Sequence, residues 1–220
     1  MSGQLSLFEC KIDLELSGSV AESKDRAIPQ DEEGLICFEQ TALNKVLPAR
    51  YFRGLDDAAV QVRPFGPAVA VCGTGNDVEC AEMRWGENRH DGAAVPTTQR
   101  DRGLWRRMLS VSDIGRCIVV ADRFATRQWK DGRPLLAWVT PEQGTPFFLA
   151  GHWHMTSGGP VLSLLERASA GPLRRVGPLV PLMLAETDVW RWLNGRPWIV
   201  STEIEMRRKR HSITTTASAS

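Results

Sequence analysis

The stretch RCIVVADRFATRQW, residues 116–129, does most to decide the fold. Its first half, from Arg116 to Asp122, is short and almost wholly apolar, which is the pattern of a strand buried on both faces. The second half, ADRFATRQW (121–129), reads as the end of that strand followed by a polar turn tipped by Trp129. The segment therefore predicts a buried strand whose end carries polar side chains, the uncharged Gln128 among them.

Similar strand signals flank this stretch on both sides. Alternation or short apolar runs predict strands at residues 5–16, 58–62, 67–73, 135–139 and 146–153. The second and third of these are expected to form a hairpin around the turn Pro64-Phe65-Gly66-Pro67. Strand-rich stretches separated by turns predict mostly antiparallel pairing.

Helical spacing of apolar residues appears in two places. It predicts helices at 102–111 and near 185–194, whereas residues 35–47 have mixed periodicity and fit a strand followed by a helix. The fold class predicted is α+β, with mostly antiparallel strands in a curved sheet or barrel and a few flanking helices. The apolar strands are expected to supply the core residues Ile118, Val120, Leu136, Trp138, Phe148, Leu149, Leu162 and Leu182.

The size and composition of the chain predict one globular domain. The 220 residues are 42% hydrophobic and 24% charged, which suits a single domain over residues 1–205, and the basic, Ser/Thr/Ala-rich residues 206–220 are expected to form a disordered tail. No apolar run approaches the ~18 residues of a membrane span, and no leader pattern opens the chain. Five scattered cysteines without a CxxC pair are typical of reduced thiols. We therefore expect a cytoplasmic monomer without a membrane partner.

Charge is distributed unevenly along the chain. Residues 1–40 carry three basic and nine acidic side chains, whereas residues 100–133 carry nine basic and four acidic ones. Eight of those nine basic residues are arginines, which favour bidentate contact with phosphate groups. The middle section thus indicates nucleic-acid binding, and the alternative is a solvated charged face.

Other chemical motifs are weak. His152 and His154 are two residues apart, so a strand would place both on one face, but no third metal ligand stands at a recognisable spacing. The string CGTGND (72–77) lacks the lysine of a phosphate-binding loop, and no nucleophile elbow is present. We expect neither a metal nor a cofactor.

The order of several short strings is more specific. They are MSGQL (1–5), PARYF (48–52), EMRWG (82–86), RCIVVADRF (116–124), QWKDGRP (128–134), FFLAGHW (147–153) and VPLML (180–184). This order resembles the SOS-response-associated peptidase (SRAP) family, whose members process abasic sites in single-stranded DNA. The family shows Arg-Tyr-Asn, Met-Arg-Trp-Gly, Asn-Ala-Arg-x-Glu, Arg-Cys-x-x-x-Ala-Asp-Gly-Phe-x-Glu-Trp and His-x-x-x-Pro elements. The resemblance, which extends to about residue 201, implies an SRAP-like fold and a role in the response to DNA damage.

The departures from the family pattern fall on its catalytic positions. The resemblance places Ser2 where the family has a cysteine nucleophile, Gln128 where it has a glutamate, and Gly177 where it has a histidine. The family's asparagine segment falls on residues 96–102, which contain no asparagine. A hydroxyl needs an activating base, and a primary amide cannot transfer a proton. The pattern predicts a pseudoenzyme with no intact catalytic residue.

The groove that binds DNA in the family retains more of its residues. Arg84 and Trp85 match Met-Arg-Trp-Gly, where the family has a Trp wedge against a base, and Arg50 and Tyr51 match Arg-Tyr-Asn. We expect a basic groove for single-stranded, abasic or junction DNA, with contacts from Arg50, Arg84, Trp85, Arg100, Arg102, Arg123 and Arg127. The alternative is that the aromatic residues belong to the core and the arginines only solubilise the surface.

Two further functions remain open. The groove or the acidic N-terminal third could bind a protein partner, which would make the chain an interaction module. The amine of Ser2 could alternatively form a Schiff base with an abasic site, which would leave a weak cross-linking enzyme. Acidic residues such as Asp122 or the cluster 31–33 could also neutralise the basic face.

Overall fold

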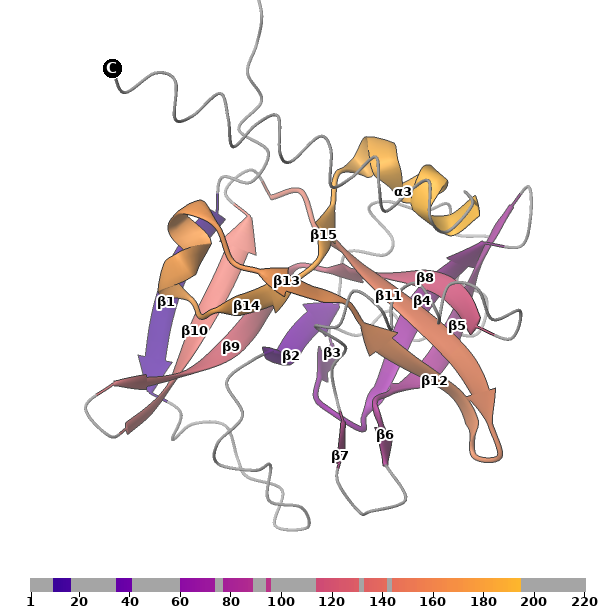
Figure 1. Ribbon diagram of the computed structural model, residues 1–220, viewed down its shortest axis with the longest axis horizontal. Coiled ribbons are helices and arrows are strands. Elements are labelled where there is room, and N and C mark those ends of the chain that lie inside the picture. Colours follow the sequence, from indigo (N-terminus) through magenta and orange to yellow (C-terminus); the bar gives the residue numbers. More distant parts are fainter. Residues whose placement is uncertain are drawn as a thin grey trace, which may run out of the picture.

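The computed structural model describes residues 10–16, 35–40, 60–73, 77–88, 94–95, 114–130, 133–141 and 144–194 (Figure 1). Most of these residues lie in strands. In chain order the elements are β1 (Cys10–Leu16), β2 (Leu35–Gln40), β3 (Val60–Val62), β4 (Pro67–Gly73), β5 (Val78–Trp85), β6 (Glu87–Asn88), β7 (Ala94–Val95), β8 (Ile114–Ala121), β9 (Arg123–Lys130), β10 (Arg133–Pro141), β11 (Phe147–Thr156), β12 (Gly159–Leu164), β13 (Glu166–Ala168), the 3-10 helix η3 (Gly171–Arg175), β14 (Leu179–Pro181), β15 (Met183–Leu184) and α3 (Glu186–Asn194).

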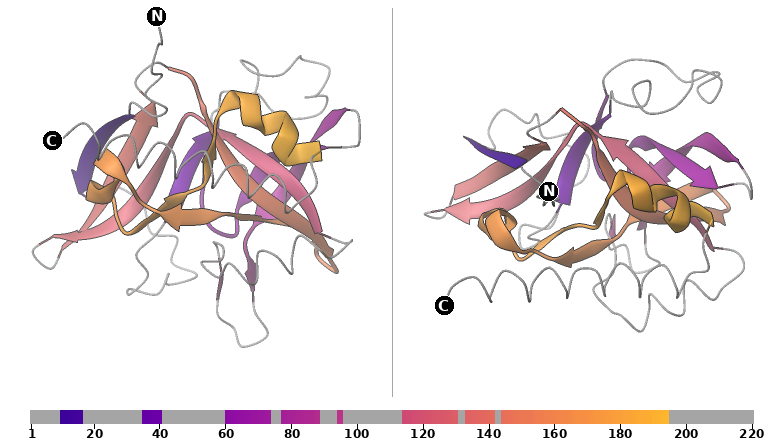
Figure 2. Two further views of the ribbon diagram at one scale, coloured as in Figure 1. Left: turned by 45° about the horizontal axis from the view of Figure 1, so that its top comes forward. Right: turned by 90° about the horizontal axis from the view of Figure 1, so that it is seen from above.

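Two sheets dominate the fold. The first has the strand order β1-β10-β9-β2-β3, and every pairing in it is antiparallel. The second has the order β12-β5-β4-β8-β11-β15, and β12 also pairs with β11. Because β12 pairs with both β5 and β11, strands β5, β4, β8, β11 and β12 form a closed ring. The two sheets lie side by side in both views of Figure 2.

Buried apolar side chains form three clusters on the faces of these sheets. The largest joins the inner side of the ring to one face of the first sheet, with Phe38 and Trp85 in ring contact at 4.9 Å. A second cluster lies under α3, whose Trp192 and Leu193 belong to it. The third contains Cys37, Ala125, Leu136 and Trp138 on the other face of the first sheet. The expected core is confirmed, since all eight residues are at most 6% exposed: Ile118, Val120, Leu136, Trp138, Phe148, Leu149, Leu162 and Leu182.

Gln40 connects the two sheets at the end of β2. Its amide nitrogen donates to the carbonyl of Val69 (2.8 Å) and to that of Val120 (3.2 Å), and its amide oxygen accepts from the Val69 N–H (3.0 Å). Gln40 is only 6% exposed, so these bonds satisfy a buried amide and three backbone groups of β4 and β8 together. A second link beside it runs from the Asp122 N–H to the Glu39 carbonyl (2.8 Å).

Several sequence predictions hold in the described residues. Strands at 10–16, 114–121, 133–141 and 147–156 and the helix at 186–194 match the expected elements. The ambiguous segment begins as a strand, Leu35–Gln40. The fold is nevertheless mostly sheet, because α3 is the one α-helix among the described residues, where α+β with several flanking helices was expected.

Two predictions about connections are wrong. β3 and β4 do not pair as a hairpin, since β3 pairs with β2 and β4 pairs with β5 and β8. The turn between them instead carries the chain from one sheet to the other: Phe65, at φ 66°, donates its N–H to the carbonyl of Trp85 (2.7 Å). Likewise 123–130 is no polar turn but the strand β9, which β10 and β2 hold on either side.

Other predictions fall outside the described residues. These are the strand at 5–9, the helix at 102–111 and the tail at 206–220. Among the residues that are described, no helix combines the length and the apolar character needed to cross a membrane.

Candidate functional site

The site begins with two polar side chains on one face of β9. Thr126 and Gln128 alternate along the strand with Arg127, so they share a face. The Thr126 hydroxyl donates to the carbonyl of Val176 (2.8 Å), and the Gln128 amide nitrogen donates to the carbonyl of Arg175. These carbonyls lie at the C-terminal end of η3, where a helix has no backbone donors of its own to satisfy them. Strand β9 supplies the missing donors.

The bound segment is the tip of a hairpin. β13 and β14 pair antiparallel, and the Ser169 N–H donates to the Pro178 carbonyl (3.0 Å) to close the neck. Between them η3 buries Leu173, and Val176 follows it fully buried in the main core cluster. Figure 1 shows this short helical coil beside the strands β9 and β10. We refer to residues 166–181 as the η3 hairpin.

Gly177 follows directly after the bound carbonyl of Val176. Its φ of +152° belongs to a backbone conformation that L side chains rarely adopt, although the space beside it is open, with the nearest atom 3.8 Å from a built Cβ. The backbone thus favours glycine here, where the family resemblance would place histidine.

The register of β9 revises one detail of the resemblance. Seven successive pairs from Phe124–Val139 to Lys130–Arg133 run without a bulge, and the irregularity opposite lies in β2, between Leu35 and Cys37. To place the family's glutamate on Gln128, the resemblance needs two extra residues before Trp129, and β9 shows no irregularity at that point. Counted without a gap from Ala121, the family's glutamate falls on Thr126 instead of Gln128. Both candidates are engaged with the η3 hairpin, and neither side chain carries a carboxylate.

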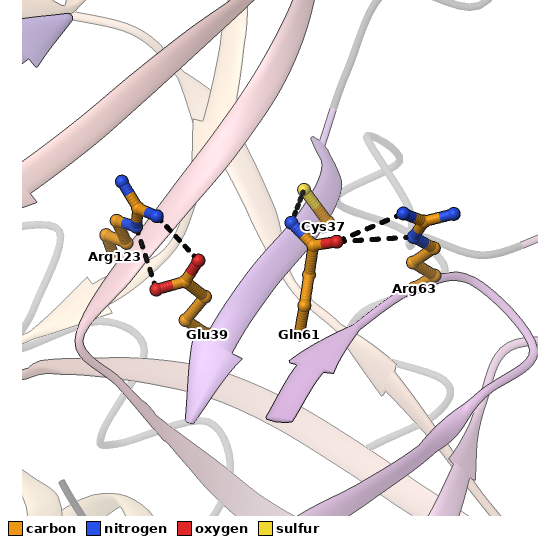
Figure 3. Close-up of polar contacts among 5 residues, drawn as sticks. All are labelled: Cys37, Glu39, Gln61, Arg63 and Arg123. Atoms are coloured by element: carbon orange, nitrogen blue, oxygen red, sulfur yellow. Dashed lines mark hydrogen bonds and ion pairs between the residues drawn. The ribbon is translucent and has the colours of Figure 1, made fainter. Parts of the chain in front are cut away.

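Arg123 is occupied by a partner within the chain. Its Nε and one terminal nitrogen donate to the two carboxylate oxygens of Glu39 at 2.8 and 2.7 Å (Figure 3). Its guanidinium also lies over the Trp138 ring, 4.1 Å from the ring centroid. A bidentate pair stacked on an aromatic face fixes the guanidinium and neutralises its charge. The expectation that Arg123 holds a DNA phosphate does not fit this arrangement.

A second polar group lies on the same region of the sheet. The Gln61 amide nitrogen donates to Sγ of Cys37 at 4.0 Å, and Arg63 donates to the Gln61 amide oxygen (3.1 and 3.4 Å), as Figure 3 shows. These contacts are local to β2 and β3. They place Arg63 on a neutral amide, and no sequence signal had singled out this arginine.

Trp85 and Arg84 are neighbours on β5 but differ in their exposure to solvent. Trp85 is 0% exposed in the main cluster against Phe38, so its indole has no face open to a stacked base. The indole completes the core between the two sheets, and the wedge role expected for Trp85 would require it to leave this position. Arg84 is exposed on β5, next to β12 and close to Gly158. The structure thus places Arg84 on the closed ring of strands, away from the sheet that carries Arg123.

Of the remaining residues expected at the DNA site, one is described by the structure and the others are not. Arg127 lies half-buried on β9, on the face opposite to Thr126 and Gln128, with its Nε shielded from solvent and without a hydrogen-bond partner among the described residues. Ser2, Arg50, Arg100 and Arg102 lie outside the described residues. One common groove for all seven DNA contacts is therefore not assembled within the described part of the chain.

The two histidines lie on β11 on the side of the ring covered by α3. Burial and, to a smaller extent, His154 lower the pKa of His152 to about 4, so His152 is neutral at neutral pH. Arg116, its register partner on β8, donates to the carbonyl of Trp192 (2.6 Å) at the end of α3. No group of three or more metal-ligating side chains is found in the part of the chain that the structure describes.

Three cysteines of the ring are poor nucleophiles. Burial, with Glu79 and Cys80 adding smaller effects, raises the pKa of Cys72 to about 12. Burial also raises the pKa of Cys80 to about 11 and that of Cys117 well above its usual value. Thiols with such pKa values are protonated at neutral pH, and thiolate chemistry is not available to them.

No protein-family model and no curated protein matches this sequence. Among the solved structures that share its fold are two from bacteria. A crystal structure of a protein from Bordetella bronchiseptica has a TM-score of 0.54 at 16% identity, over 76% of this chain and 92% of that one. A crystal structure of a protein from Bacteroides thetaiotaomicron has a TM-score of 0.50 at 13% identity, over 73% and 81%. At these identities the likeness establishes a shared fold alone.

Proposed function

We propose that this chain is a divergent, catalytically degenerate SRAP-like protein that binds single-stranded DNA without processing abasic sites. The order of the sequence strings from PARYF to VPLML supports the family assignment. The fold shared with two solved structures is compatible with it.

One observation gives the main support for a loss of catalytic activity. Thr126 and Gln128, the two residues that can stand for the family's glutamate, both donate hydrogen bonds to backbone carbonyls of the η3 hairpin. A general acid and base must exchange a proton with the substrate, and neither a threonine hydroxyl nor a primary amide does so at neutral pH. Gly177 adds no side chain at the neighbouring position.

DNA binding is supported by exposed cations that have no acidic partner in the described part of the fold. Arg84, Arg174 and Arg175 are exposed, and none of them has an acidic partner among the residues that the structure describes. Exposed guanidinium groups bind phosphodiesters through paired hydrogen bonds and release counterions as they do so. Such contacts are independent of base sequence.

The test is a titration with single-stranded, duplex and abasic oligonucleotides at low salt and at ~150 mM salt. We expect affinity for single strands that falls with salt and does not require the abasic site. Borohydride trapping on abasic DNA separates this result from residual chemistry at the Ser2 amine. An adduct that depends on borohydride would indicate a weak cross-linking enzyme.

A second candidate is a protein-interaction module. Trp190 on α3 is 50% exposed and Met155 on β11 is 64% exposed, which makes them the large apolar side chains most open to solvent in the described structure. Exposed aromatic residues are enriched at protein interfaces. Absence of any DNA binding at low salt would favour this candidate over the first.

A further inference from the structure

Several described arginines are engaged by partners within the chain. Arg123 is paired with Glu39, Arg116 donates to a backbone carbonyl, and Arg63 donates to a glutamine amide. Arg174 and Arg175 differ from them, because both are exposed and neither has an ion pair or a side-chain hydrogen bond among the described residues. They were not among the DNA contacts expected from the sequence.

The backbone beneath Arg174 and Arg175 is held more firmly than their exposure suggests. Leu173 on one side and Val176 on the other are buried in the main cluster. The carbonyl of Arg175 itself accepts from Gln128, and the next carbonyl accepts from Thr126. The two guanidinium groups therefore project from a fixed base.

The same contacts explain why these guanidinium groups remain available. Basic side chains near a helix C-terminus commonly turn back to bind its last carbonyls. Here β9 already supplies donors to the carbonyls of Arg175 and Val176. The arginines are left to solvent, and the 3-10 geometry, with three residues per turn, directs adjacent side chains about 120° apart. Two such side chains reach two different phosphates.

We propose that the tip of the η3 hairpin is a phosphate-contacting element for single-stranded DNA, in which Arg174 and Arg175 hold separate phosphates and Gln128 is the residue that positions them. This inference rests on the proposed function. It moves the principal cationic contacts from β9, where Arg123 is neutralised, to the hairpin that packs against β9. Gln128 acts through the backbone of Arg175 and touches no DNA.

The first experiment measures salt-dependent binding of a labelled oligothymidine. The double variant Arg174→Ala/Arg175→Ala should lower the salt slope by about 1.4, because each phosphate contact to a single strand contributes about 0.7. The control Lys11→Ala/Arg191→Ala also removes two exposed positive charges, from β1 and α3, of which Lys11 pairs with Asp13, and it should keep the wild-type slope. An unchanged slope in the hairpin variant, beside normal wild-type binding, overturns the inference and leaves the proposed function standing.

The second experiment tests positioning by a double-mutant cycle. Gln128→Leu removes the donor without adding charge and should weaken oligothymidine binding several-fold, whereas Gln61→Leu at an exposed amide of β3 should not. In the Arg174→Ala/Arg175→Ala background, Gln128→Leu should have no further effect. If Gln128→Leu weakened oligothymidine binding equally in both backgrounds, Gln128 would not act through these arginines.

A third readout needs no DNA. Amide hydrogen exchange across residues 171–177 should accelerate in Gln128→Leu, while the exchange of β8 and β11 stays as in the wild type. Unchanged exchange in the hairpin contradicts the positioning role directly. Failure of wild-type protein to bind oligothymidine at low salt is a separate result, which removes the proposed function itself.

Discussion

Gln40 and Val69 exchange two hydrogen bonds across the boundary between the two sheets, with the amide of one residue facing the backbone of the other at 2.8 and 3.0 Å. A third bond, to the Val120 carbonyl, makes Gln40 the point where β2, β4 and β8 meet. Its buried position means that no water replaces these bonds when the amide is lost.

Replacing this amide should destabilise the whole fold. Gln40→Leu leaves one buried and two part-buried hydrogen bonds to the backbone unmade, and we expect the free energy of unfolding to fall by about 2–4 kcal/mol, since each unsatisfied buried group costs about 1–3 kcal/mol. Urea unfolding measures the change. Gln61→Leu, at an exposed glutamine, serves as the control and should alter stability by less than about 0.5 kcal/mol.

The acid sensitivity of the fold should depend on His152. Its pKa is about 4 in the folded protein and near 6.5 when unfolded, so the unfolded chain binds a proton first as the pH falls. The free energy of unfolding is unaffected by His152 protonation above pH ~6.5. It falls as the pH drops toward ~4, by about 2–3 kcal/mol in all.

Unfolding free energies of wild type and His152→Phe measured between pH 7 and pH 4 check this prediction. The variant should lose much less stability across that range than the wild type, and His154→Gln should behave nearly like the wild type. Parallel pH profiles for wild type and His152→Phe would show that His152 does not set the acid sensitivity.

The Arg123–Glu39 pair should contribute to stability and not to DNA binding. Arg123→Met breaks a bidentate pair and a contact with the Trp138 ring, and we expect a coupling energy of about 1 kcal/mol between Arg123 and Glu39 in a double-mutant cycle with Glu39→Gln. The affinity for oligothymidine and its salt slope should stay unchanged. A slope that falls by one phosphate contact would return Arg123 to the DNA interface.

Restoring the family's residues should not restore its chemistry. Gly177→His places a side chain at φ +152° and should cost about 1–3 kcal/mol of stability. Ser2→Cys supplies a thiol but leaves Thr126 and Gln128, neither of which is an acid, bound to the η3 hairpin. We expect Ser2→Cys alone and Ser2→Cys/Gly177→His to form little heat-stable adduct with abasic single-stranded DNA. Efficient cross-linking by either variant would mean that the proton-transfer groups are still present.

The sequence predicted the apolar strands well and their partners less well. Ile118, Val120 and Leu149 lie in short apolar runs, whose burial follows from composition alone. The pairing of β3 with β2 could not be predicted from the sequence, because local periodicity carries no information about which sheet a strand joins. The turn at Phe65 looks like a hairpin turn in sequence, but its hydrogen bond goes to Trp85 in β5.

The candidate site shows the same limit for polar residues. Gln128 was singled out because of its place before Trp129, and it does lie at the contact with the segment that carries Gly177. Arg123 was assigned to DNA by its charge and Trp85 by the family's Met-Arg-Trp-Gly motif, yet Glu39 lies 84 positions from Arg123 and Phe38 lies far from Trp85 along the chain. Arg174 and Arg175 carry no motif, and only the fold shows that β9 anchors their backbone and leaves their side chains exposed.

We propose that the protein binds single-stranded DNA and does not react with abasic sites, and one assay tests both statements. Wild-type protein is incubated with labelled abasic single-stranded DNA, and each sample is divided between a native gel and a heated denaturing gel. We expect a salt-sensitive shifted band on the native gel, equal for abasic and intact strands, and no shifted band after heating. A heat-stable adduct with the abasic strand, formed by the unmodified protein, would contradict the account.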